Sequence, residues 1–278
     1  MKRIVTIQDI SCFGKCSLTV ALPVISAMGV EAAVIPTAVL STHTVFKNFT
    51  FRDLTEDIPA ISDHWKQEQI TFDGIYTGYL GSFRQIDLMA DFFDRFRNEN
   101  TLIFVDPVMA DNGKLYAGFA EEFPAQMAKL CGKADVIVPN ITEACLMTGM
   151  EYKTEYDEAY IKTLFEKLSR LGAGVTILTG VSFAPGTTGV MGYDRKTGEY
   201  YYYKHKKLDR IFHGTGDIFS STCVGAMMQG KPWQEAVRIA ADYTTECIAL
   251  TMNDPKAGAY GVNFEEGMPY LLKRAGLI

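Results

Sequence analysis

Apolar positions along the chain form two kinds of stretch, short continuous runs and longer segments with helical spacing. The continuous runs at residues 101–105 and 174–179 predict strands buried on both faces, because polar and apolar side chains do not alternate in them. Residues 83–98 instead predict an amphipathic helix, with these large side chains on one face: Ile86, Met89, Phe92, Phe93 and Phe96.

The same alternation continues along the chain. Further strands are predicted at residues 3–7, 32–36, 72–77 and 136–138, and a hairpin at 190–193 and 200–204. Helices are predicted at about 17–28, 156–171, 218–229 and 234–251. Strands that alternate with helices favour a mostly parallel sheet covered on both faces. We therefore expect an α/β fold, a three-layer αβα sandwich, as a single domain over residues 1–278.

Composition narrows the class of protein. The chain has 278 residues, 47% hydrophobic content and a net charge of −6, which is ordinary for a soluble globular protein and argues against nucleic acid as the main partner. Pro23, Gly29, Glu31 and Pro36 interrupt the apolar stretch 20–40, which predicts a buried helix and strand rather than a membrane span. We expect a cytoplasmic protein with no membrane partner.

Six cysteines occur without a Cys-x-x-Cys pair or a tight framework: Cys12, Cys16, Cys131, Cys145, Cys223 and Cys247. Free, buried thiols in a reducing compartment are the simpler interpretation. The apolar part of the N-terminal segment is too short for a signal peptide, which agrees with this expectation.

Polar residues just after the predicted strands mark the expected ligand site, because open α/β sheets bind ligands beyond the carboxyl ends of their strands. Asp106, Asn140, Glu143 and Asp217 follow strands and can converge on one crevice. Oxygen ligands of this kind suit Mg²⁺, which needs only a carboxylate or two besides substrate phosphates. The alternative is that Asn140 and Glu143 simply begin the next helix as a cap.

The most informative motif is Gly214-Thr215-Gly216-Asp217, directly before an apolar helix. Two glycines let backbone N–H groups gather at a helix N-terminus, which forms an anion site. A carboxylate beside that site suits a base that takes a proton from a hydroxyl attacking a phosphate, so the motif predicts a small-molecule kinase. Alternatively, Asp217 only stabilises the start of the helix through its dipole.

Several other signatures are absent. Residues 13–17 resemble a Walker loop, but Asp9 stands where the upstream glycine belongs and Cys16 where Ser or Thr should hold the metal. The chain has no Gly-x-Gly-x-x-Gly, protein-kinase, zincin or Gly-x-Ser-x-Gly motif. Its four histidines are scattered, so a histidine-rich metal site is not expected.

The motif at residues 214–217 resembles the anion hole and catalytic base of the ribokinase-like superfamily. Within this superfamily, the chain is similar to the pyridoxal (vitamin B6) kinases. The similarity is carried by the segments 41–44, 77–82, 106–109 and 139–143 together, and it runs in the same order along most of the chain. The resemblance implies an ATP- and Mg²⁺-dependent kinase that phosphorylates the hydroxymethyl group of a B6 vitamer, with a small-molecule substrate and a homodimeric assembly.

The resemblance also assigns roles to residues. Asp217 is the expected base, and Gly214, Thr215 and Gly216 form the anion hole. The expected Mg²⁺ ligands, direct or through water, are Asp106, Asn140 and Glu143, with Asp111 as a helper. The expected ATP-binding residues are Asn140, Thr179 and Gly180, and the expected substrate-binding residues are Asp9, His43, Thr44 and Tyr79. Apart from the resemblance, the segments 186–189 and 204–210 are our candidates for a mobile cover over ATP.

Asp9 departs from the pattern, because many pyridoxal kinases carry serine there. A carboxylate would favour the aminomethyl group of pyridoxamine over an aldehyde; alternatively, Asp9 caps the following loop. We also expect the helix N-terminus to lower the pKa of Asp217. Two other functions stay open: a hydroxymethylpyrimidine kinase of thiamine synthesis, and a non-catalytic vitamer- or nucleotide-binding protein on the same fold.

Overall fold

A computed structural model describes residues 1–208, 210 and 212–278 of the chain. These residues form two compact units, Met1–Gly78 with Leu208–Ile278, and Tyr79–Lys207. Asp209, in the expected cover segment 204–210, lies outside the described residues.

The first unit is built on the parallel strands β1 (Arg3–Ser11), β2 (Glu31–Leu40) and β4 (Gly74–Thr77). The short strand β3 (Phe51–Asp53) runs antiparallel to β2, and the order is β4-β1-β2-β3. The register between β1 and β2 shifts between Gln8 and Ile10. Asp9 therefore sits at an irregularity of the ladder, a place where a strand re-aims a side chain.

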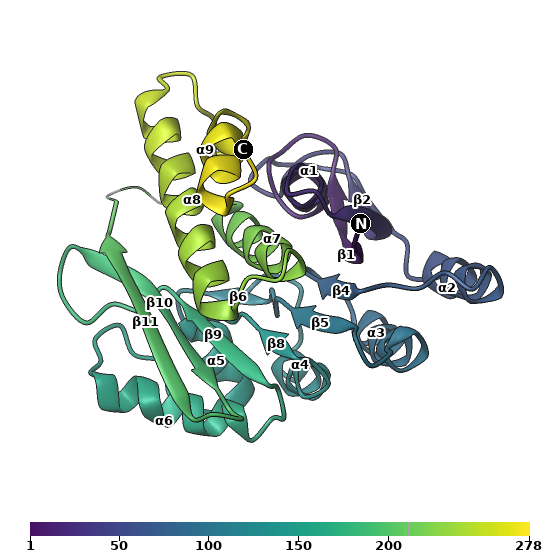
Figure 1. The fold of residues 1–278 in the computed structure, drawn as a ribbon, viewed down its shortest axis with the longest axis horizontal. Coiled ribbons are helices and arrows are strands. Elements are labelled where there is room, and N and C mark those ends of the chain that lie inside the picture. The colour runs from purple at the N-terminus through teal and green to yellow at the C-terminus, as the bar shows by residue number, and fades with distance from the viewer. Residues whose placement is uncertain (209, 211) are drawn as a thin grey trace. The chain divides into compact units, whose positions relative to one another are not determined.

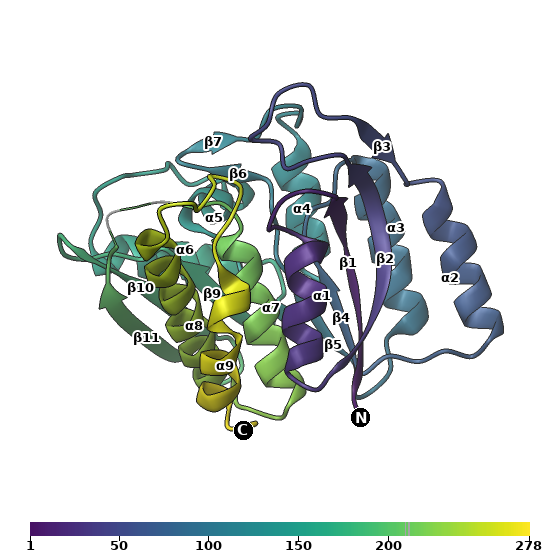
Figure 2. The ribbon, with the colours of Figure 1, turned by 90° about the horizontal axis from the view of Figure 1, so that it is seen from above.

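Five helices accompany these strands: α1 (Leu18–Ala27), α2 (Asp57–Gln67), α7 (Thr215–Met228), α8 (Trp233–Asn253) and α9 (Phe264–Ala275). Helices α1, α7, α8 and α9 lie side by side (Figures 1 and 2). Helix α7 packs closely against α1, since a Cβ on Gly225 would lie 2.7 Å from the sulfur of Met28. This close packing joins the C-terminal part of α7 to the end of α1.

The second unit contains the parallel strands β5 (Leu102–Val105), β8 (Val136–Ile137) and β9 (Val175–Thr179). The antiparallel hairpin of β10 (Thr187–Asp194) and β11 (Glu199–Lys206) extends them in the order β11-β10-β9-β8-β5. A separate small hairpin joins β6 (Ala110–Asp111) to β7 (Lys114–Leu115).

The helices of the second unit are α3 (Phe83–Phe96), α4 (Phe123–Cys131), α5 (Ile141–Thr148) and α6 (Glu158–Ser169). The predicted apolar face of α3 is buried as expected. Ser82 caps the N-terminus of this helix by accepting a hydrogen bond from the backbone N–H of Gln85.

The chain is a mixed α/β protein whose mostly parallel strands are flanked by helices, which confirms the predicted fold class. The prediction of one domain over residues 1–278 stays a prediction. Among the described residues, none of the helices combines the length and apolar character needed to span a membrane. All six thiols are free as predicted, but Cys12 is exposed rather than buried.

Candidate functional site

The turn before α7 has the geometry expected of an anion hole. Gly214 is the N-cap of α7 with φ 75° and ψ 0°, a left-handed conformation that favours glycine. A side chain there would overlap the backbone carbonyl oxygen of Lys15, so glycine is also required by space. The N–H groups of Thr215 and Gly216 belong to the first helical turn and have no acceptor within the helix. Gly216 is exposed, with nothing within 4 Å of a Cβ at that position.

Asp217 follows this turn, is partly exposed, and lies against the buried residues Asp9 and Ser17. Ser17 connects the two carboxyl groups, since its backbone N–H donates to Asp217 and its hydroxyl donates to Asp9. Ser17 has φ 47° and ψ −127°, a strained conformation for a residue with a side chain. The structure therefore brings the predicted base together with one predicted substrate residue.

The electrostatics of the carboxyl pair differ from the sequence expectation. Burial, with a smaller contribution from the charge of Asp9, raises the pKa of Asp217 to about 7, and the Ser17 N–H opposes this shift. Burial likewise raises the pKa of Asp9. The expectation that the helix N-terminus lowers the pKa of Asp217 is wrong, because loss of solvent outweighs the dipole.

His43 lies in the first unit as well. Its ring Nδ1 accepts a hydrogen bond from the backbone N–H of Val45 at 3.0 Å, so the neutral ring carries its proton on Nε2. Burial lowers the pKa of His43, and the neighbouring His213 lowers it further. The two ring centroids are 4.8 Å apart. Thr44 follows as an exposed residue.

The second unit brings Asp106, Asn140 and Glu143 together. Asn140 and Glu143 form a capping box at the start of α5, so the predicted cap is present, while their part in a metal site stays a prediction. Both carboxylate oxygens of Glu143 already accept backbone N–H bonds, one from Met109 at 3.1 Å and one from Asn140 at 2.9 Å. Burial raises the pKa of Glu143 well above its usual range, and the charge of Asp106 adds to the effect.

Asp106, Asn140 and Glu143 fit a Mg²⁺ site only when other ligands complete the coordination of the ion. Over the described part of the chain, no group of three or more His, Cys, Asp and Glu side chains is placed to hold a metal ion. The side-chain amide of Asn140 is also engaged, since its Nδ2 donates to the carbonyl oxygen of Ala110 at 2.8 Å. Mg²⁺ commonly takes one or two carboxylates, several waters and substrate phosphates, and Asp106 with Glu143 satisfies that need. Asp111 is exposed on the β6–β7 hairpin, and its carboxylate accepts hydrogen bonds from Asn112.

Thr179 ends strand β9 beside Asn140, and Gly180 follows it. The backbone of Thr179 forms a parallel bridge with Asn140, and its N–H donates to the carbonyl of Pro139 at 3.1 Å. Gly180 has φ 75° and open space where a Cβ would lie. The three residues predicted to bind ATP are therefore adjacent within the second unit.

Tyr79 belongs to an aromatic group in the second unit. Its ring centroid lies 5.7 Å from that of Phe119, which in turn lies 4.1 Å from Phe123. A Cβ on Gly81 would lie 3.3 Å from the Tyr79 ring, so the glycine leaves room for it. Tyr79 thus belongs to an aromatic group in a different unit from Asp9 and His43.

Sequence reasoning missed Ser17 and His213. Nothing local in the sequence indicates a serine with a positive φ that contacts both Asp9 and Asp217. His213 had one signal, its position directly before Gly214, which places it at the start of the anion-hole turn.

Known structures resemble the whole chain. A candidate phosphomethylpyrimidine kinase from Bacteroides thetaiotaomicron VPI-5482, crystallised with pyridoxal, is 38% identical with a TM-score of 0.93, over 97% of this chain and 95% of its own. Pyridoxal kinase from Lactobacillus plantarum is 30% identical with a TM-score of 0.90, over 98% and 97%. By sequence, the pyridoxine/pyridoxal/pyridoxamine kinase of Bordetella avium (strain 197N) is 25% identical over 89% of this chain and 85% of that protein.

Fold, site and neighbours together define a phosphotransferase of the ribokinase-like superfamily that acts on a hydroxyl group, as the motifs predicted. Within that class, residues 18–263 match the family described as phosphomethylpyrimidine kinase, and the chain belongs to this family.

Proposed function

We propose that this protein transfers the γ-phosphoryl group of ATP to the hydroxymethyl group of a vitamin B6 vitamer, which would salvage pyridoxal 5'-phosphate. The observation that carries the proposal is Asp217, a carboxyl with a pKa of about 7 directly after a glycine-rich helix start. The substrate class is supported by the 38% identity to a protein crystallised with pyridoxal and by the 30% identity to a pyridoxal kinase.

In the proposed reaction, the hydroxymethyl oxygen attacks the γ-phosphorus while the bond from that phosphorus to the β–γ bridging oxygen breaks, which releases ADP. The hydroxyl proton passes to the carboxylate of Asp217. A base with a pKa near neutrality is ionised at working pH and still holds a proton well. The backbone N–H groups of the anion hole, Gly214, Thr215 and Gly216, stabilise the charge on the transferring group.

Asn140, Thr179 and Gly180 are the proposed nucleotide-binding residues, because they adjoin one another where strand β9 ends and helix α5 begins. Asp106, Glu143 and Asn140 would hold Mg²⁺. Glu143 and Asn140 would do so through water, because their side chains already cap α5. When bound, Mg²⁺ neutralises negative charge on the ATP phosphates.

Asp9, His43, Thr44 and Tyr79 are the proposed vitamer-binding residues. His43 presents an Nε2–H donor, because Nδ1 is already used as an acceptor. The carboxyl group of Asp9 accepts a hydrogen bond from Ser17 and has room to accept others, which favours a positively charged ring substituent on the vitamer. Tyr79 supplies a flat face of the kind that packs on a heteroaromatic ring.

A second candidate is the phosphorylation of hydroxymethylpyrimidine in thiamine synthesis, which is favoured by the description of the family itself. Its substrate also carries a hydroxymethyl group on a heteroaromatic ring, so the role of Asp217 would be unchanged.

One assay separates the candidates. ADP release from Mg·ATP is measured side by side with pyridoxal, pyridoxine, pyridoxamine and hydroxymethylpyrimidine. We expect the highest kcat/KM with a B6 vitamer, whereas preference for the pyrimidine would move the protein to the second candidate. Asp217→Ala should abolish turnover and keep vitamer binding; binding without turnover in the unaltered protein would instead indicate a non-catalytic binder.

We further propose a homodimer in the cytoplasm, by analogy with the family resemblance. Light scattering after gel filtration measures the assembly directly, and a monomer at assay concentration would refute it. The segment 186–189 remains our candidate for a cover over ATP, and equal proteolysis with and without nucleotide would count against it.

A further inference from the structure

Lys15 lies in the β1–α1 loop, the segment that resembles a Walker loop but lacks its glycine and its Ser or Thr. Its ammonium is already paired: Nζ donates to Oε2 of Glu265 at 2.8 Å and to Oδ1 of Asn263 at 3.2 Å. It also lies 5.8 Å from the ring centroid of Phe264, and only 23% of the side chain is exposed. The lysine is thus held at the start of α9.

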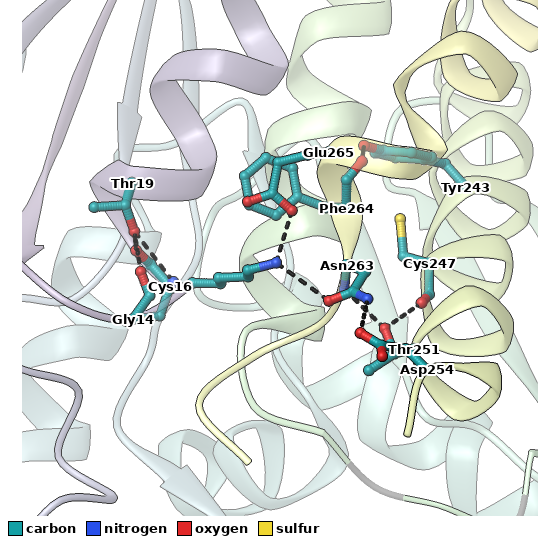
Figure 3. Close-up of polar contacts among 11 residues, drawn as sticks. Gly14, Cys16, Thr19, Tyr243, Cys247, Thr251, Asp254, Asn263, Phe264 and Glu265 are labelled. Carbon is teal, nitrogen blue, oxygen red and sulfur yellow. Dashed lines mark hydrogen bonds and ion pairs between the residues drawn. The ribbon is translucent and has the colours of Figure 1, made fainter. Parts of the chain in front are cut away.

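One partner of Lys15, Asn263, is itself held at the C-terminal end of α8 (Figure 3). The amide Nδ2 of Asn263 donates to Oδ2 of Asp254 at 2.9 Å, and its backbone N–H donates to Oγ1 of Thr251 at 2.7 Å. The Thr251 hydroxyl donates to the carbonyl of Cys247 at 2.6 Å. The ammonium is therefore tied through a short chain of hydrogen bonds to the C-terminal end of a long helix.

The main chain of Lys15 contacts two further segments. Its N–H donates to the carbonyl oxygen of Tyr260 at 3.0 Å. Its carbonyl oxygen fills the space that a Cβ on Gly214 would occupy, and its own Cβ does the same at Gly261. Three segments thus meet at this one residue: the β1–α1 loop, the α8–α9 connection and the turn that begins α7.

We propose that Lys15 is a positioning residue for the anion hole: the ion pair with Glu265 fixes its backbone, and its carbonyl then fixes Gly214. The proposal rests on the proposed function insofar as the bound anion is the transferring phosphoryl group. Backbone donors stabilise a transition state only when they are held in place before the reaction. Without the ammonium, the loop loses its side-chain attachment to α9, and the turn at Gly214 loses a fixed neighbour.

The same loop also carries Ser17, which donates to both Asp9 and Asp217. Helix α1 begins directly after it, at Leu18. Movement of the loop at Lys15 therefore reaches the base as well as the anion hole. Both effects act on the chemical step, so they should lower kcat more than they weaken binding of vitamer or ATP.

The test compares Lys15→Met, Lys15→Arg and Glu265→Gln. Methionine keeps the length and apolar stem that pack near Phe264, and arginine keeps the charge. The control is Lys162→Met, which removes a similar ion pair, 2.7 Å from Glu158, on α6 of the second unit. Two quantities are measured in each variant: kcat and KM with Mg·ATP and the best vitamer, and the rate of amide hydrogen exchange in a peptide covering residues 212–220.

For Lys15→Met we expect kcat to fall roughly ten-fold or more with KM changed less than about two-fold, since small displacements of reacting groups cost at least this much. Lys15→Arg should recover most of the activity, Glu265→Gln should lose part of it, and the control should match the unaltered protein. Exchange in the 212–220 peptide should be faster in Lys15→Met and Glu265→Gln only.

Two results would overturn the proposal. A rise in KM for ATP or vitamer with kcat unchanged would mean that Lys15 contacts a substrate directly. Unchanged exchange at residues 212–220 in Lys15→Met would mean that the ion pair does not hold the turn. The exchange measurement also separates this proposal from the proposed function: absence of turnover in the unaltered protein refutes the latter, while exchange still decides the role of Lys15.

Discussion

Asp217→Asn should make the protein inactive and, above neutral pH, more stable. Asparagine keeps the shape of the side chain and removes the charge that burial disfavours. The pKa of Asp217 is raised on folding, from 3.8 to about 7, so between these pH values the unfolded chain has lost a proton that the folded protein keeps. The stability of the unaltered protein therefore falls as pH rises through this window, and the variant escapes that loss.

The size of the effect follows from the same shift. A pKa raised from 3.8 to about 7 corresponds at most to ~4 kcal/mol of lost stability above pH 7. Asp217 is only partly buried, and water screens much of this cost, so we expect about 1–2 kcal/mol at pH 8. Part of this loss of stability is already present at pH 5. The stability of the unaltered protein should therefore differ by ~1 kcal/mol between pH 5 and pH 8, which corresponds to about 2–4 °C in Tm.

Thermal unfolding is followed by circular dichroism for both proteins at pH 5, 6, 7 and 8. The gap in Tm between variant and unaltered protein should widen steadily with pH, while kcat falls by several orders of magnitude. Asp87→Asn, at an exposed position on α3, is the matched control for loss of one negative charge. A constant gap, or the same widening in the control, would refute burial of Asp217 as the cause.

Three further predictions use the same proteins and assays. Asp9→Ser should lower kcat/KM for pyridoxamine relative to pyridoxal; an unchanged ratio would remove Asp9 as the selecting residue. Gly214→Ala should abolish activity and should lower stability more than Gly180→Ala does. Both glycines have φ 75°, but only at Gly214 would the added Cβ collide with backbone atoms. Equal losses of stability in chemical unfolding would contradict this. Asn140→Ala should lower the free energy of unfolding by about 1 kcal/mol, because it removes the capping box, and should raise the Mg²⁺ concentration needed for half-maximal rate. An unchanged Mg²⁺ titration would mean that Asn140 caps the helix but does not help to hold the metal.

The order of the main elements is predictable from the sequence because buried parallel strands are continuous apolar runs. The run 101–105 becomes β5 and the amphipathic stretch 83–98 becomes α3, each within two residues at either end. The short elements β3, β6 and β7 were not predicted, since strands of two or three residues are fixed by pairing and not by their own pattern. Helices α2, α4 and α9 were also missed; α9 contains Pro269 within the helix.

The end of strand β1 is predicted less well than the bounds of β5 and α3. The difference matters because Asp9, a candidate site residue, lies in this part of the strand. The apolar pattern ends at Ile7, but the strand continues to Ser11, because Gln8 and Asp9 are buried and the ladder with β2 resumes at Ile10. The polar residues were expected in a loop. Their place in an irregular part of the ladder is what buries Asp9 beside Asp217, and no local signal in the sequence gives that burial.

The basicity of Asp217 shows why a motif alone does not define the chemistry. The tetrapeptide 214–217 places a carboxylate at a helix N-terminus, and from that position alone a lowered pKa follows. Burial and the charge of Asp9, a residue more than two hundred positions away, reverse the sign. Ser17 limits the reversal through one N–H bond, at the cost of a strained backbone. The raised pKa of Asp217 therefore depends on three segments: β1, the loop after it and the start of α7. Under the proposed function, in which Asp217 is the base, a substitution in any of them should shift the acidic limb of the pH–rate profile.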